Sequence, residues 1–285
     1  MAVPNIRLNN GISMPQLGFG VFQVPNRETE AAVTAALDAG YRSIDTAAAY
    51  GNEEGVGAAI AKSGIPRADL FITTKLWNDD HGYDSALRAF DESLRKLGLD
   101  QVDLYLIHWP RPLRDKYVET WHAFEKLLAD GRVRAIGVSN FQPAHLRRVI
   151  DETGTEPAVN QIELHPYLTQ AELRAFHTRH SIATEAWSPL AKGGDLLTEP
   201  MVTGLAAKYG RSPAQVVLRW HLQLGNVVIP KSVTPARIRE NFAVFDFELA
   251  DDEMARIAAM DTGESLFFDH RDPTMVGQLG NMRVD

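Results

Sequence analysis

The chain has 285 residues, of which 45% are hydrophobic and 23% are charged, and it carries a formal net charge of −8. These values are typical of a globular protein, and the length suits a single α/β barrel. The negative charge argues against a nucleic-acid partner or an anionic membrane surface, although it leaves room for a local basic pocket. Because the sequence contains no cysteine, disulfides, thiolate metal sites and cysteine nucleophiles are excluded.

The ends and the internal composition of the chain indicate a simple organisation. The first residues lack the charged and then apolar leader of a secreted protein, and no apolar run approaches the roughly 20 residues of a membrane span. We therefore expect a soluble, cytoplasmic protein without a membrane partner. The sequence shows no linker, no repeat and no low-complexity tract, so residues 1–285 are expected to form one domain.

A β-hairpin is predicted at the start of the chain, where the turn pair Asn10-Gly11 separates two short apolar runs. After it, short β-branched runs alternate with longer amphipathic stretches, which is the pattern of βα units. The expected strands cover residues 16–20, 42–45, 70–75, 102–107, 134–139, 158–162, 182–186 and 227–229.

The amphipathic stretches complete the predicted fold. The expected helices cover residues 28–38, 53–62, 85–97, 118–130, 143–151, 170–180, 213–224 and 235–241, with one more at 251–260. Eight βα units predict a (β/α)8 TIM barrel with an N-terminal β-hairpin and extra helices. Residues 261–285 are expected to form a loop-rich tail.

Polar or aromatic residues follow nearly every predicted strand. In a parallel barrel the carboxyl ends of the strands meet at one rim, where the active site lies. Random surface polarity would not be so regular. The residues expected at this rim are Asp45, Lys75, His108, Ser139, Asn140, Gln161, Trp187, Ser188, Lys231 and Ser232.

Four of the residues near this rim form an acid–base set. Lys75 and Asp45 are a natural ion pair, and a lysine close to Tyr50 favours the phenolate, so we expect it to make the phenol a stronger acid. His108 could orient a carbonyl oxygen by a hydrogen bond. The set suits protonation of a carbonyl that receives a hydride. Because no side chain donates hydride, a cofactor is implied.

A second candidate site follows the last predicted strand. Lys231, Ser232 and Arg237 surround the start of a helix at Pro235, and barrels often bind phosphate at such a place. These side chains would suit a dianionic monophosphate such as the 2′-phosphate of NADP. Trp187 offers a flat face for a nicotinamide ring. The amides of two further rim residues suit its carboxamide group, namely Asn140 and Gln161.

Three segments resemble the signatures of the aldo-keto reductase family: residues 40–57, 132–141 and 229–244. The resemblance covers nearly the whole chain. Residues 50–57 and 74–79 are most similar to the bacterial 2,5-diketo-D-gluconate reductases. The resemblance implies a monomeric enzyme that uses NADPH to reduce aldehydes and ketones, among them dicarbonyls and keto sugars, to alcohols. In such an enzyme Tyr50 is the general acid, and Asp45, Lys75 and His108 support it.

The resemblance also implies residues for the cofactor and the substrate. NADPH would be bound by Ser139, Asn140, Gln161, Trp187, Ser188, Leu190, Lys231, Ser232, Val233, Arg237, Glu240 and Asn241. The substrate pocket would be lined by Phe22, Trp77, Trp109 and His108, with Phe267 or Phe268 from the tail. Many relatives have tyrosine where this chain has Trp187, and residues 190–194 differ from the bacterial branch. No metal site is expected, since the acidic stretch 79–81 has the character of a loop before a helix.

Two other functions fit parts of this pattern. Lys75 alone could be the Schiff-base lysine of a barrel lyase. Alternatively, the same fold could hold NADPH as a redox sensor or regulatory subunit with little turnover. The complete set of Asp45, Tyr50, Lys75 and His108 favours the reductase over both. His165, which also follows a predicted strand, is interpreted as structural.

Overall fold

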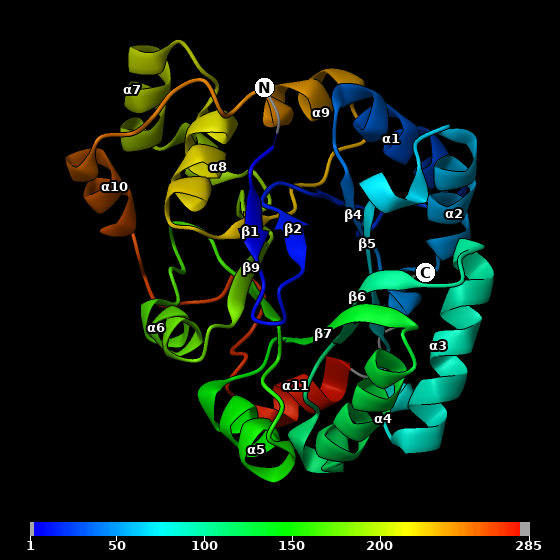
Figure 1. Cartoon of the computed structure of the whole chain (residues 1–285). Helices are drawn as coiled ribbons and strands as arrows, with labels where there is room; N and C mark the ends of the chain where they lie inside the picture. The colour runs from blue at the N-terminus through cyan, green and yellow to red at the C-terminus, as the bar shows by residue number, and fades with distance from the viewer. Residues whose placement is uncertain (1–2, 280–285) are drawn as a thin grey trace.

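The computed structural model describes residues 3–279, which form a barrel of parallel strands surrounded by helices (Figure 1). The sheet order is β10-β9-β8-β7-β6-β5-β4-β3, and a parallel bridge between Leu17 and Val228 joins its two edges. The predicted TIM barrel is therefore confirmed. The strands are β3 Phe19–Gly20, β4 Ser43–Asp45, β5 Phe71–Leu76, β6 Val102–Ile107, β7 Val133–Ser139, β8 Val159–Glu163, β9 Ala183–Trp187 and β10 Val227–Val228.

Helices form the outer layer of the barrel, and every helix expected from the sequence is present. None of those within residues 3–279 combines the length and apolar composition needed to cross a bilayer. The helices are α1 Asn26–Ala39, α2 Glu53–Lys62, α3 Tyr83–Leu97, α4 Tyr117–Ala129, α5 Pro143–Thr153, α6 Ala171–Arg179, α7 Pro200–Tyr209, α8 Pro213–Gln223, α9 Pro235–Phe242, α10 Asp251–Ala258 and α11 Pro273–Leu279.

Helix α3 illustrates how the sequence directs these elements. Its inward residues Ala86, Phe90 and Leu94 recur every four positions, which places them on one face of a helix. The opposite face is exposed and charged. The helix ends at Leu97 and is capped by Gly98, whose φ of +64° is a left-handed conformation that glycine adopts without strain.

Two helices were not expected. Helix α7 lies between β9 and α8 and buries only Val202, Leu205 and Ala206, so its apolar periodicity is weak. Helix α11 lies in the tail that was expected to be loop-rich, and this expectation is wrong for residues 273–279. The part of the tail at 280–285 lies outside the described residues. Within α11 the side chain of Val276 is buried, so tertiary contacts rather than periodicity support this short helix.

The barrel interior is filled at its amino end by the hairpin of β1 (Asn5–Arg7) and β2 (Ser13–Pro15), which Figure 1 shows in front of the strands. Leu8 and Met14 from the hairpin pack against Phe71, Leu104 and Val159 of the barrel. A separate, larger cluster fills the space between strands and helices. The amino end of the barrel is thus closed by apolar packing, which leaves the carboxyl end for a site.

Candidate active site

The predicted catalytic residues meet at the carboxyl end of the barrel. Asp45 is the last residue of β4, and Lys75 lies near the end of the neighbouring strand β5. His108 follows β6 directly. Tyr50 comes from the short 3-10 helix η1 (Ala48–Tyr50) in the loop after β4. Because inward positions alternate along each strand, these side chains converge on one point.

Lys75 is the centre of this group. Its side chain is fully buried, and its Nζ donates a hydrogen bond to Oδ1 of Asp45 at 2.6 Å and to the carbonyl oxygen of Thr46 at 2.9 Å. The same Nζ lies 3.3 Å from the hydroxyl oxygen of Tyr50. Burial disfavours the ammonium form, but Asp45 and Tyr50 outweigh this and raise the pKa of Lys75. The lysine is therefore a cation held against the phenol.

The pKa of Tyr50 is set by two opposing effects. Burial raises it above its usual range, and the nearby charge of Lys75, which lowers it, offsets only part of this effect. Lys75 therefore favours the phenolate as expected, but burial, which depends on how completely the barrel encloses the hydroxyl, has the larger effect on the pKa of Tyr50. At neutral pH the phenol consequently holds its proton, as a general acid must.

His108 lies against the same phenol. Its ring centroid is 5.7 Å from that of Tyr50 and 5.4 Å from that of Trp77. Burial and then the charge of Lys75 hold the pKa of His108 well below its ordinary value. The imidazole is therefore neutral at physiological pH. It can donate a hydrogen bond to a carbonyl oxygen, but it is not a source of protons there.

Glu185 was missed by the sequence analysis. It lies on β9 and is fully buried, and its Oε2 accepts a hydrogen bond from Nε2 of Gln161 at 2.8 Å. The same nitrogen donates to Oδ2 of Asp45, also at 2.8 Å. The period-2 pattern could have revealed it, since Glu185 precedes Trp187 by two positions and so faces the same side of the strand.

Four of the predicted cofactor residues form a continuous chain of hydrogen bonds. The indole Nε1 of Trp187 donates to Oδ1 of Asn140 at 2.8 Å, and Nδ2 of Asn140 donates to Oγ of Ser139 at 3.0 Å. The Ser139 hydroxyl in turn donates to the backbone carbonyl of Gln161 at 2.8 Å. Three strands, β7, β8 and β9, are thus linked along one side of the site, and the indole plane is fixed.

The remaining predicted cofactor residues lie on two loops and on α9. The side chains of Lys231, Val233, Arg237 and Glu240 are exposed, those of Ser188, Leu190 and Ser232 are half-buried, and that of Asn241 is buried. Within residues 3–279, neither Lys231 nor Arg237 has an acidic partner, in contrast to most arginines of the chain. The two cations beside the amino end of α9 therefore carry uncompensated charge.

Aromatic side chains surround the open side of the site. Phe22, which is 40% exposed, lies with its ring centroid 5.0 Å from that of Tyr50. The tail contributes both of its predicted phenylalanines. Phe268 packs against Trp109 at 5.5 Å, whereas Phe267 packs against Trp187 at 5.1 Å, both measured between ring centroids. Phe268 thus lies on the predicted substrate side and Phe267 on the predicted cofactor side.

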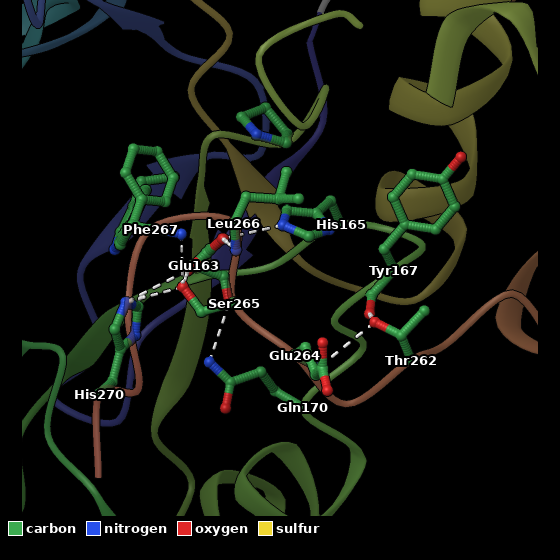
Figure 2. A network of polar contacts seen from close by, with 12 residues as sticks. Glu163, His165, Tyr167, Gln170, Thr262, Glu264, Ser265, Leu266, Phe267 and His270 are labelled. Atoms are coloured by element: carbon green, nitrogen blue, oxygen red, sulfur yellow. Dashed lines mark hydrogen bonds and ion pairs between the residues drawn. The ribbon is translucent and has the colours of Figure 1, made fainter. Parts of the chain in front are cut away.

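A buried carboxylate anchors this part of the tail (Figure 2). Glu163, at the end of β8, accepts a hydrogen bond from the hydroxyl of Ser265 at 2.5 Å and from the backbone N–H of Leu266 at 3.0 Å. Nε2 of His270 lies 3.2 Å from the same carboxylate, and Nε2 of His165 lies 3.0 Å from it. His165 is completely buried in this network, in line with a structural role. The tail is therefore attached to the barrel at a defined point.

The acidic stretch at 79–81 has partners of its own. Asp79 and Asp80 belong to the 3-10 helix η3 (Asn78–Asp80), and Oδ1 of Asp79 lies 3.4 Å from both Arg111 and Arg114. The side chain of His81 is buried. This arrangement belongs to the loop after β5 and is distinct from the group around Lys75.

Known proteins are similar to this chain in both sequence and fold. A model of the Aldo/keto reductase family matches residues 16–262. An aldo-keto reductase of Mycolicibacterium smegmatis is 59% identical over 268 residues, covering 94% of this chain and 97% of that protein. The methylglyoxal reductase DkgA of Escherichia coli (strain K12) is 55% identical, covering 93% and 97%. The crystal structure of a Gox0644 mutant in complex with NADPH has a TM-score of 0.90 at 50% identity, covering 93% and 97%.

The class of the protein follows from two observations. The barrel carries an acid–base group at its carboxyl end, and the family model matches most of the chain. The chain belongs to the aldo/keto reductase family and is an oxidoreductase. The family predicted from residues 40–57, 132–141 and 229–244 is confirmed.

Proposed function

We propose that this protein reduces aldehydes and ketones to alcohols with NADPH, and that Tyr50 is the general acid. The observation that carries the proposal is the contact of a buried, charged Lys75 with the hydroxyl of Tyr50, at an Nζ–Oη distance of 3.3 Å. Similarity to a methylglyoxal reductase and to a structure that contains NADPH supports it.

The acid–base group supplies the proton that the reaction needs. NADPH, when bound, supplies the hydride to the carbonyl carbon. Tyr50 gives its proton to the carbonyl oxygen, and the ammonium of Lys75 stabilises the phenolate that forms. Asp45 keeps Lys75 charged and in place. The neutral imidazole of His108 orients the carbonyl oxygen by a hydrogen bond.

The chain has groups that fit NADPH. Both hydrogens of the Gln161 amide are directed at carboxyl groups, so its Oε1 is the atom that can accept the N–H of a carboxamide. The fixed indole of Trp187 offers a face to a nicotinamide ring. The unpaired cations Lys231 and Arg237 suit a 2′-phosphate. The other proposed contacts are Ser139, Asn140, Ser188, Leu190, Ser232, Val233, Glu240 and Asn241.

The aromatic side chains indicate small carbonyl substrates. Phe22 packs on Tyr50 and Trp77 on His108, while Trp109, which follows His108 in the chain, packs on Phe268. We propose that these apolar side chains suit dicarbonyls and open-chain keto sugars with a short carbon skeleton. We also propose that the protein is a cytoplasmic monomer. A Schiff-base role for Lys75 is disfavoured, because the neutral amine that such chemistry needs is suppressed by Asp45.

The proposal is tested by the loss of NADPH absorbance with methylglyoxal, 2,5-diketo-D-gluconate, aromatic aldehydes and keto steroids. Turnover by the wild type that disappears in Tyr50→Phe supports the proposal. Tight NADPH binding without turnover on any member would instead favour the sensor, and trapping of Lys75 by borohydride in the presence of a carbonyl compound would favour the lyase.

A further inference from the structure

Glu185 is a fully buried carboxyl group that is linked to Asp45 through the amide of Gln161. The proposed reaction assigns no role to it. It lies on β9, opposite Gln161 of β8 in the strand register. Its Oε2 accepts one hydrogen bond from the amide of Gln161 at 2.8 Å. Its Oε1 is buried and has no hydrogen-bond partner within residues 3–279. An ionised carboxylate in this position would lack most of the donors that it needs.

The amide of Gln161 holds two carboxyl groups at once. Its Nε2 donates to Glu185 and to Asp45, at 2.8 Å in each case. The other oxygen of Asp45 accepts the short hydrogen bond from Lys75. Two carboxyl groups therefore share one amide and one cation in an enclosed interior. A single ammonium neutralises one carboxylate, and a second buried negative charge would be uncompensated.

Among the described residues that interact with Glu185, Lys75 is the only cation. Burial and then the negative charge of Asp45 raise the pKa of Glu185 to about 8, although Lys75 and the amide of Gln161 act in the opposite direction. The groups that face Glu185 are Asp45 from β4, Lys75 from β5, Gln161 from β8, the apolar Val227 from β10, and Tyr50 from η1.

We propose that Glu185 is a positioning residue that acts in its protonated form. It holds the amide of Gln161 in one orientation and limits the charge around Lys75 to a single ion pair. This inference rests on the proposed function, because the orientation matters by presenting Oε1 of Gln161 to the carboxamide of NADPH.

The ionisation of Glu185 would change the pKa of the general acid, Tyr50. An added negative charge on Glu185 raises the pKa of Tyr50 and of Lys75, since both interact with it. The phenol then becomes a poorer proton donor, and reduction slows. Glu185 thereby sets an upper pH limit for the reduction of carbonyl compounds, above which the proton of Tyr50 is held too tightly.

Infrared difference spectroscopy of the protein without cofactor tests the protonation directly. The wild type at pH 7 is expected to show the carbonyl stretch of a protonated carboxylic acid, which disappears as the pH rises past about 8 and is missing in Glu185→Gln. Glu163→Gln is the matched control, because Glu163 is equally buried. Burial raises the pKa of Glu163, but its hydrogen bonds together with the charge of His270 outweigh this and hold the pKa below the usual value. A wild type without that band at pH 7 would overturn the proposal.

The pH profile of kcat/KM tests the link to catalysis. The wild type is expected to lose activity between pH 7 and about pH 9, whereas Glu185→Gln, which stays neutral, is expected to lose it only at higher pH. Glu185→Ala, which releases Gln161, is expected to weaken NADPH binding about tenfold, the value of one hydrogen bond. Identical pH profiles for the wild type and Glu185→Gln would show that the ionisation of Glu185 does not limit the reaction at high pH.

The two proposals fail in different ways. The infrared band needs neither cofactor nor substrate, so it reports on Glu185 even if none of the carbonyl compounds is reduced. If instead turnover depends on Tyr50 but the band is absent, the reductase function stands and the role of Glu185 does not. Should Glu185→Gln fail to fold, the titration of the wild-type band still decides the question.

Discussion

The two ends of the barrel are built from the same strands but differ in chemistry. At the amino end, Phe71 of β5 and Val159 of β8 pack on Met14 of the hairpin in an apolar cluster. Further along the same strands and on the same face, the inward positions hold Lys75 and Gln161. A shift of two to four residues therefore takes the chain from apolar packing to an enclosed set of charges.

This contrast separates stability from function along each strand. The apolar end contributes free energy of folding through burial. The polar end has to keep charged groups away from water, which costs free energy unless they are paired. Substitutions at the two ends should accordingly change different quantities, and the following predictions are arranged from the largest expected effect to the smallest.

Tyr50→Phe removes the proton donor at the polar end. We expect kcat for carbonyl reduction to fall roughly 10²- to 10⁴-fold, the usual contribution of a general acid. The dissociation constant of NADPH and the midpoint of urea unfolding should stay close to those of the wild type. Steady-state kinetics measure kcat, a fluorescence titration with NADPH measures the dissociation constant, and urea unfolding measures the midpoint. Turnover that persists in the variant would remove Tyr50 from its assigned role.

Leu104→Ala acts at the apolar end. Leu104 is completely buried next to the hairpin, so its truncation should lower the free energy of unfolding by about 3 kcal/mol. The kcat of the folded variant should be unchanged. Urea unfolding and activity at low temperature give the two values, with the exposed Leu113→Ala as control. A large loss of kcat without loss of stability would contradict the separation of the two ends.

Arg237→Ala removes one of the unpaired cations beside α9. Because a hydrogen bond to a charged group contributes about 1.5–3 kcal/mol, NADPH binding should weaken roughly 10- to 100-fold. The binding of NADH, which lacks the 2′-phosphate, should hardly change. Titration calorimetry with both cofactors measures the ratio, and Arg256→Ala on α10 is the control. Equal weakening of both cofactors would argue against a phosphate contact.

His177 lies outside the candidate site, and its titration should change stability without changing activity. It is buried on α6 between Asn160 and Thr184, and burial followed by the charge of Arg174 lowers its pKa to about 3. Below an ordinary value of about 6.5 the unfolded chain binds a proton that the folded chain excludes, so stability falls as the pH drops from 6.5 towards 3.

The measurement is urea unfolding at pH 7.5 and at pH 5.5. Between these values the wild type should lose about 1.4 kcal/mol more than His177→Gln, which has no proton to bind. Activity per folded molecule should not follow this change, since His177 contacts none of the catalytic residues. The same pH dependence in both proteins would mean that His177 is not the source of the loss.

Most elements of the fold could be predicted from local patterns. The strand at 102–107 and the helix at 53–62 were expected with the bounds that the structure has. The strand is buried at all six positions, so its apolar run is nearly continuous, and the buried Val56, Ala59 and Ile60 of the helix recur at helical spacing. Helix α7 and helix α11 were missed, since few of their residues are buried and their apolar patterns are correspondingly short. Such helices depend on neighbouring elements more than on their own sequence.

Most residues of the candidate site, like most elements of the fold, could be predicted from the sequence. Rim residues stood out because each follows a strand, and the barrel then brought Asp45, Tyr50, Lys75 and His108 together. Glu185 did not stand out, because it lies within its strand rather than after it. The tail contacts of Glu163 depend on residues about one hundred positions apart, for which the sequence alone has no signal.

The sequence by itself determined the alternation of strands and helices, the family and the residues at the carboxyl ends of the strands, because these follow from local periodicity and short motifs. The tertiary structure decided how those residues behave. It showed that burial outweighs Lys75 and raises the pKa of Tyr50, and that Glu185 shares an amide with Asp45. Desolvation and the balance of charges are sums over all neighbouring elements, so they exist only once the barrel has closed.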